Sequence, residues 1–197
     1  HAPNYRMNEL TGAVGLAQIK KVKSVVEKRN ELGEYLTRLL ADIKGLRTAP
    51  VTEGAKHSYW LYPLYLEHID INVFAQEMKK EGVGVSAGYT VKPIYLCTES
   101  LTSKKTYGNS GCPFSCKFTD KIYEYKEGLC PKAEEALKHL ICIPLNESWS
   151  KNKVEQAAKA IKKSVKKISG EGDFISVSAV KKAALPQVAK TEERKKK

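Results

Sequence analysis

The sequence predicts an α/β fold in which a long leading helix precedes a short, mainly antiparallel sheet with helices packed on one face. Two observations support this prediction. Apolar residues recur at steps of three and four from Leu10 to Leu40, which is the pattern of an amphipathic helix. Three later stretches, 58–66, 83–86 and 141–145, are short and apolar and alternate with helical patterns, as the strands of a small α/β domain do.

The leading helix has a clear start. Asn8 is a good N-cap because its side-chain oxygen accepts hydrogen bonds from free amides of the first turn. Two glycines in a helix interior, Gly12 and Gly15, each cost about 1 kcal/mol relative to alanine. We therefore expect another backbone to approach this helix closely. Gly33 predicts a break into two helices, and Gly45 ends the second of them.

The middle of the chain alternates between strand and helix. Residues 46–57 read as a loop and 58–66, rich in aromatic residues, as a strand. A helix is predicted from Asp70 to Gly82, followed at once by a strand over 83–86. Residues 87–129 show no strong period, and irregular stretches of this length in compact domains are usually functional or partly disordered.

The C-terminal part contains two further helices around a last strand. Pro131 opens a helix, because proline is well tolerated at the first helical position. The strand over 141–145 is predicted at a sheet edge, because Pro144 cannot donate to a ladder. Ser150 caps a final amphipathic helix that runs to Ile168. We divide the chain into a leading motif with linking helices (1–45), a small α/β domain (46–168) and a basic tail (169–197).

Composition excludes some classes of protein. Apolar residues make up 42% of the chain and the mean hydropathy is −0.42, values typical of a soluble globular protein. Uncharged runs fall well short of the roughly 20 residues that a membrane helix needs. The net charge is +12, and residues 151–197 carry 14 of the 34 basic residues against five acidic ones. Charge confined to one helix and a tail favours nucleic-acid binding much less than a generally basic fold does.

The five cysteines are scattered and odd in number, which predicts reduced thiols in a cytoplasmic protein. The pair Cys112 and Cys116 has three residues between the thiols, a spacing known for zinc ligands. The other spacings are irregular, so ordinary thiols are favoured and no metal is predicted.

The strongest functional signal is the run Asn4-Tyr5-Arg6-Met7-Asn8-Glu9-Leu10 with the small residues that follow it. It resembles the signature of the DegT/DnrJ/StrS sugar aminotransferases. The resemblance continues through four later stretches and covers roughly residues 3–168. These stretches are His57-Ser58-Tyr59-Trp60-Leu61-Tyr62-Pro63, Gly82-Val83-Gly84-Val85, Pro93-Ile94-Tyr95, and Cys130-Pro131-Lys132-Ala133-Glu134 with Leu145 and Asn146.

This resemblance implies the small C-terminal domain of a fold-type I enzyme that uses pyridoxal 5′-phosphate (PLP). In the family, the lysine that forms the Schiff base and most phosphate donors lie upstream of the Asn-Tyr-Arg motif. The chain starts with His1, directly on the motif, so we expect a piece of a longer protein. Its cofactor would be bound mainly by a missing N-terminal domain, and the chain alone is expected to be inactive.

The resemblance also implies roles for individual residues. Asn4 and Arg6 would bind the cofactor phosphate of the neighbouring subunit in a homodimer, since an amide and a guanidinium suit a phosphate dianion. Tyr89, Trp60 and Tyr95 would line the substrate site; the family often has histidine at the positions of Gly88 and Tyr95. The expected substrates are a keto-sugar or keto-cyclitol and, as amino donor, glutamate or glutamine.

Simpler interpretations remain open for these residues. Asn4 could cap a turn and Arg6 could pair with a surface acid, while Trp60 and Tyr89 could be core aromatics. A different class of function is a basic module that binds nucleic acid or an anionic surface through the lysine-rich last helix and tail. The clean apolar face of that helix, which lacks tryptophan and phenylalanine, favours a solvated lysine face instead.

Overall fold

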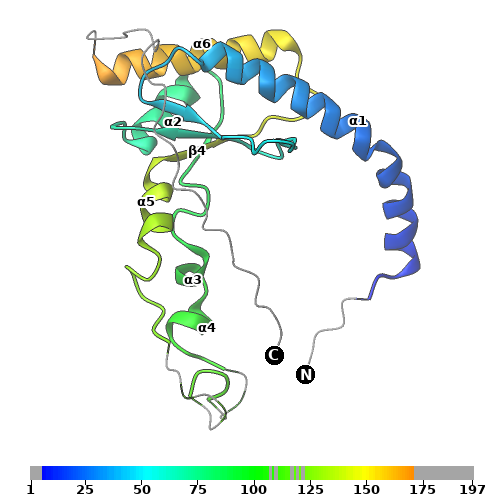
Figure 1. Cartoon of the computed structure of the whole chain (residues 1–197), viewed down its shortest axis with the longest axis vertical. Helices are drawn as coiled ribbons and strands as arrows, with labels where there is room; N and C mark the ends of the chain where they lie inside the picture. Colours follow the sequence, from blue (N-terminus) through cyan, green and yellow to red (C-terminus); the bar gives the residue numbers. More distant parts are fainter. Residues whose placement is uncertain are drawn as a thin grey trace, which may run out of the picture.

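The computed structural model describes residues 6–170 except 107, 109, 110, 116, 117, 119, 121 and 122. Helix α1 (Glu9–Leu40) begins as predicted: the side chain of Asn8 accepts a hydrogen bond of 2.8 Å from the amide of Thr11. The second half of α1 packs into the core through Leu32, Leu36 and Leu40. Its first half projects away from the rest of the described chain (Figure 1).

The predicted helix break at Gly33 is wrong, because α1 runs through it without interruption. Gly33 serves a packing purpose instead. A Cβ atom at this position would lie 2.5 Å from the ring of Tyr59, closer than any real contact. The glycine lets that ring lie directly against the helix backbone.

The sheet has four strands in the order β1-β2-β4-β3, and every neighbouring pair is antiparallel. This confirms the predicted fold class, in which helices pack on a small antiparallel sheet. The strands are β1 (Leu46–Thr48), β2 (Tyr62–Leu66), β3 (Ser86–Ala87) and β4 (Leu140–Ile143).

Three strand predictions need correction. β1 lies inside the stretch predicted as a loop, and only Ser86 of the predicted strand 83–86 is in the ladder. β4 lies between β2 and β3 and not at an edge. Pro144 imposes no edge position because the ladder ends one residue earlier, at Ile143.

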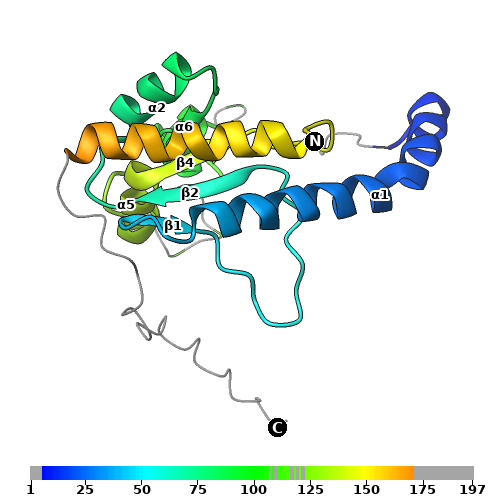
Figure 2. The same ribbon diagram turned by 90° about the horizontal axis from the view of Figure 1, so that it is seen from above.

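Helices cover both faces of the sheet, and not one as predicted. Helices α1, α2 (Ile71–Lys80) and α6 (Lys151–Ser169) pack against the face that carries Tyr62, Leu64 and Leu66. Figure 2 shows α1 and α6 running side by side above the strands. Helix α5 (Pro131–His139) lies on the opposite face, where the ring of His139 packs on that of Tyr65 at 5.0 Å.

The region predicted to be irregular forms an arm below the sheet (Figure 1). Its described part contains two one-turn helices, α3 (Ile94–Cys97) and α4 (Glu99–Thr102). The arm is connected to the domain through β3 at one end and α5 at the other. The tail predicted over 169–197 lies outside the described residues from position 171 onward.

Candidate functional site

Two of the three predicted substrate residues lie next to each other. The rings of Trp60 and Tyr89 meet edge to face, with centroids 6.4 Å apart and an interplanar angle of 85°. Trp60 is 66% exposed and Tyr89 is 46% exposed, so neither is a core residue. Two exposed aromatic rings that come from separate parts of the chain form a candidate platform for an apolar ligand face.

The backbone on both sides of this pair is unusual. Tyr59, Tyr89 and Val91 have φ angles of 46°, 49° and 67°, in the left-handed region that disfavours residues with a Cβ. Each costs roughly 1–2 kcal/mol, and such conformations concentrate at functional sites.

The positive φ at Tyr59 is linked to the outward position of Trp60. The ring of Tyr59 is buried against Gly33 and stacks on Tyr62 at 5.6 Å, while the next residue, Trp60, points to solvent. The amide of Tyr59 donates a 2.9 Å hydrogen bond to Nδ1 of His57. The side-chain amide of Asn30 in α1 in turn donates to the carbonyl of His57 at 3.1 Å. Local bonds and core packing therefore hold Trp60 in its exposed position.

Tyr95, the third predicted substrate residue, contacts another part of the chain. Its hydroxyl donates a hydrogen bond to the carboxylate of Glu134, and the amide of Cys130 donates to the hydroxyl at 3.4 Å. Burial, and then the neighbouring carboxylate, raise the pKa of Tyr95. In the described part of the chain, no ring contact joins Tyr95 to Trp60 or Tyr89.

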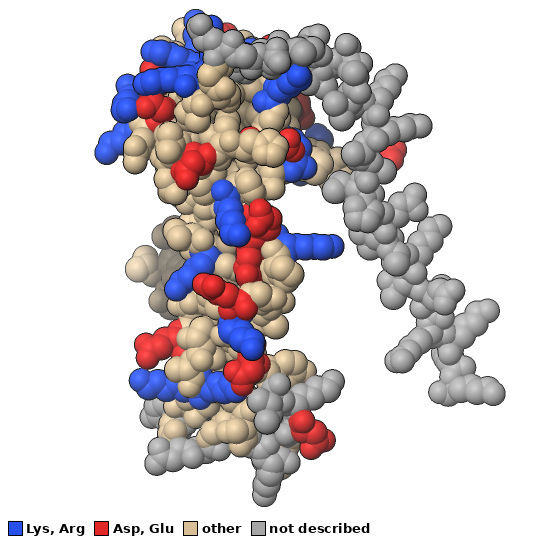
Figure 3. Space-filling model, turned by 90° about the vertical axis from the view of Figure 1, so that its left-hand side faces the viewer, with Lys and Arg blue, Asp and Glu red and all other residues tan. Residues whose placement is uncertain are grey.

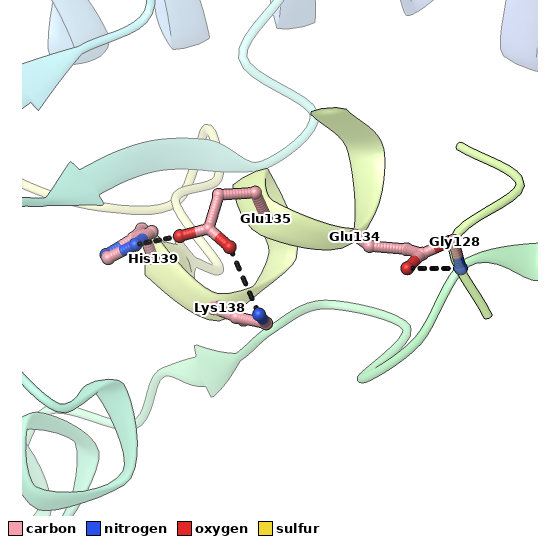
Figure 4. A network of polar contacts seen from close by, with 5 residues as sticks. All are labelled: Gly128, Glu134, Glu135, Lys138 and His139. Atoms are coloured by element: carbon pink, nitrogen blue, oxygen red, sulfur yellow. Dashed lines mark hydrogen bonds and ion pairs between the residues drawn. The ribbon is translucent and has the colours of Figure 1, made fainter. Parts of the chain in front are cut away.

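Glu134 is the partner of Tyr95, and the sequence pattern indicated it only as the last residue of the stretch Cys130–Glu134. Figure 4 shows its carboxylate at the first turns of α5, directed at the preceding loop. Both of its oxygens lie 2.9 Å from the amide of Gly128. The hydrogen bond from Tyr95, and then the bond from Gly128, lower the pKa of Glu134. The available signal was an acidic residue in the first turn of a predicted helix, directly after a glycine-containing loop.

Of the predicted phosphate-binding pair, Arg6 is exposed just before the Asn8 cap of α1, and Asn4 lies outside the described residues. A guanidinium at a helix N-terminus fits a phosphate in chemistry, since both contribute positive potential. Whether Asn4 and Arg6 act together stays a prediction.

The described residues contain no group of three or more histidine, cysteine or acidic side chains that could hold a metal ion. Cys97, Cys130 and Cys142 are free thiols, while Cys116 lies outside the described part. Burial raises the pKa of the Cys142 thiol in β4. Within the same described ranges, no helix is long and apolar enough to cross a membrane.

Lysines of α6 form ion pairs with neighbouring helices. Figure 3 shows blue and red side chains interspersed over much of the visible face. In α6, Lys163 pairs with Glu81 at 2.6 Å and Lys167 with Glu77 at 2.6 Å. Lys151 and Lys162 pair with Glu31 and Asp42, both at 3.2 Å. These lysines connect α6 to α1, α2 and the turns that follow those two helices.

Comparison with known proteins identifies the family of this chain. The sequence model of the DegT/DnrJ/EryC1/StrS aminotransferase family matches residues 1–162. The chain is 24% identical over 170 residues to the spore coat polysaccharide biosynthesis protein SpsC of Bacillus subtilis, covering 84% of this chain and 39% of SpsC. It is 25% identical over 162 residues to the dTDP-4-dehydro-2,3,6-trideoxy-D-glucose 4-aminotransferase of Saccharopolyspora spinosa, covering 80% of this chain and 34% of that enzyme.

Solved structures show the same fold. The aminotransferase TlmJ from Streptoalloteichus hindustanus superposes with a TM-score of 0.62 at 21% identity, over 83% of this chain and 38% of TlmJ. The chain thus spans less than two fifths of the length of these relatives.

Proposed function

Because this chain belongs to the DegT/DnrJ/EryC1/StrS aminotransferase family, we propose that the whole protein transfers an amino group from glutamate or glutamine to a keto-sugar or keto-cyclitol with PLP. The main structural support for a sugar or cyclitol substrate is the exposed pair of aromatic rings of Trp60 and Tyr89. Names of two relatives point the same way, to polysaccharide biosynthesis and to a 4-dehydro sugar nucleotide. PLP, when bound, supplies the electron sink for amino-group transfer.

The part of the reaction assigned to this chain is binding and orientation. The faces of Trp60 and Tyr89 offer apolar surface to the C–H groups of a sugar ring. Their held positions reduce the ordering that binding would otherwise require. Tyr95 belongs to the same predicted substrate site, and its hydroxyl contacts the carboxylate of Glu134.

Substitution of the aromatic pair tests the proposed sugar site. In the whole protein, Trp60→Ala or Tyr89→Ala should raise KM for the keto-sugar by on the order of tenfold, the equivalent of about 1.4 kcal/mol. The KM for the amino donor should change much less. Tyr123→Ala is the matched control, because Tyr123 is a 58% exposed aromatic residue outside the pair. Equal effects of all three substitutions on KM would contradict the assignment.

We also propose that the lysine that reacts with the cofactor and most of the PLP pocket lie in the part of the protein that this chain lacks. The length ratio to the relatives supports this. Incubation of the 197-residue chain with PLP, reduction with borohydride and mass measurement should give no stoichiometric pyridoxyl adduct. A single modified lysine would overturn the proposal.

Asn4 and Arg6 are proposed to bind the cofactor phosphate across a homodimer interface. Mixed dimers test this: one subunit carries Asn4→Ala with Arg6→Ala, and the other lacks the cofactor lysine. If the pair acts in trans, mixing places both defects in one site and restores activity at the other. If mass measurement confirms mixed dimers and no activity returns, the pair does not act in trans.

A nucleic-acid-binding module is supported less well. The ion pairs of Lys151, Lys162, Lys163 and Lys167 give the basic face of α6 a structural explanation. We propose a cytoplasmic location, supported by the free thiols of Cys97, Cys130 and Cys142.

A further inference from the structure

We propose that Glu134 and Tyr95 are positioning residues: their contact fixes the segment 88–92, and with it the ring of Tyr89, relative to the sheet. This inference rests on the proposed function, because it assigns a purpose to the aromatic pair. It is carried by a continuous series of contacts from β2 through α5 and α3 to Tyr89.

The first link attaches α5 to the sheet. His139 is at the end of α5, and its Nδ1 lies 2.9 Å from the carbonyl oxygen of Leu66 in β2. Its Nε2 lies 3.1 Å from Glu135, whose carboxylate also pairs with Lys138 at 3.1 Å (Figure 4). The bond between His139 and Leu66 fixes the helix that carries Glu134 to a central strand, whereas the contacts of Glu135 stay within α5.

The second link gathers three donors on one carboxylate. Glu134 accepts from the hydroxyl of Tyr95, from the amide of Gly128 at 2.9 Å and from the amide of Cys130 at 3.3 Å. Hydrogen bonds to an ionised acceptor are roughly twice as strong as neutral ones. Because Tyr95 is in α3 and Gly128 is at the far end of the arm, one side chain joins both ends of the arm to α5.

The third link runs from α3 to the segment 88–92. The thiol of Cys97 lies 3.5 Å from the carbonyl of Lys92 and 3.9 Å from that of Thr90. At the other end of the segment, the amide of Gly88 donates to the carbonyl of Leu140 in β4 at 2.8 Å. Tyr89, with its left-handed backbone, is therefore held between β4 on one side and α3 on the other.

Tyr95→Phe in the full 197-residue chain tests this inference, because it removes one hydroxyl and leaves the ring in place. Glu134→Gln is the second variant. Glu135→Gln is the matched control, since Glu135 is the adjacent carboxylate and bonds Lys138 and His139 instead. Two readouts need neither PLP nor a sugar, so they stand whether or not the proposed function holds. The first is amide hydrogen exchange. The second is the Trp60 band, which is the part of the near-ultraviolet circular dichroism spectrum that disappears in the Trp60→Phe variant.

Both variants should speed exchange of the Gly128 and Cys130 amides by about tenfold, and that of Val91, which donates to the carbonyl of Gly88, by a similar factor. The Trp60 band should weaken in both variants and stay unchanged in Glu135→Gln. Faster exchange at Gly128 with an unchanged Trp60 band and unchanged Val91 exchange would overturn the inference, because the contact would then hold only the turn before α5. Equal acceleration throughout α6 would also overturn it, because the contact would then stabilise the whole fold.

Discussion

Gly33 lies where α1 passes the ring of Tyr59, the residue that precedes Trp60. Gly33→Ala would place a Cβ atom 2.5 Å from Cδ2 and 2.6 Å from Cγ of that ring. Overpacking of this kind costs about 1–3 kcal/mol, which outweighs the gain of about 1 kcal/mol from helix propensity. We expect a lower midpoint in urea unfolding and a change in Trp60 fluorescence.

Gly15→Ala provides the control for this substitution. Gly15 is in the same helix, and nothing lies within 4 Å of the Cβ position. The added methyl group should leave the urea midpoint unchanged or raise it. If both alanine variants behave alike, close packing of Tyr59 is not the reason for the glycine at position 33.

Single residues were predictable where their role is local. Asn8, Asp70 and Ser150 begin helices in the structure as predicted, since a cap is fixed by residues within a turn of it. The packing role of Gly33 depends on Tyr59, 26 positions later, and that of Glu134 on Tyr95, 39 positions earlier. No local pattern in the sequence contains that information.

Between elements, Glu77 joins α2 to α6. Its side chain is 13% exposed and pairs with Lys167 and Lys80, both at 2.6 Å. The hydrogen bond from Lys167, and then that from Lys80, lower its pKa. A carboxylate whose pKa is lowered by folding stabilises the fold above its unfolded value of about 4.3, and this contribution is lost as pH falls through the folded value.

Glu77→Gln should therefore lower Tm at pH 7, and the difference from the unsubstituted chain should shrink below about pH 4. Glu99→Gln is the control, because Glu99 is 81% exposed and its pair with Lys105 spans 3.9 Å. This control should show little difference at either pH. A Glu77→Gln difference that persists unchanged into acid would show that the ion pairs are not its cause.

Helices were easier to predict than strands. Helices α1, α2 and α6 are long enough for their apolar repeat to be recognised in the sequence, whereas β1 has only three residues and β3 only two. The strand order β1-β2-β4-β3 brings β4 beside β2 across more than 70 residues of chain, and such pairing has no local signature. Of the site, the three aromatic residues came from the family resemblance, while the contact between Trp60 and Tyr89 emerged only in the structure.

At the scale of the whole molecule, the first half of α1 has no covering partner among the described residues. Residues 10–19 contain no charged side chain, and Leu10, Leu16 and Ile19 are 64–76% exposed. At 100° per residue, Leu10 and Ile19 lie on opposite sides of the helix. A helix that is apolar all round is normally buried. Since the chain spans less than two fifths of its relatives, we infer that other parts of the whole protein cover this helix.

The 197-residue chain by itself should therefore associate in solution as its concentration rises, because exposed apolar surface of this extent promotes contact between molecules. Ile19→Glu should weaken association by about tenfold or more, since burying one large aliphatic side chain contributes about 1.5–3 kcal/mol. Light scattering coupled to size-exclusion chromatography measures this directly. Val51→Glu is the control, because Val51 is 47% exposed but lies outside α1.

In the whole protein, Ile19→Glu should act on stability and not on association. It places a charge in a covered interface and should therefore lower Tm, while Val51→Glu should not. A chain that stays monomeric at all concentrations, or a whole protein in which both variants keep their Tm, would show that the first half of α1 is exposed in the native protein.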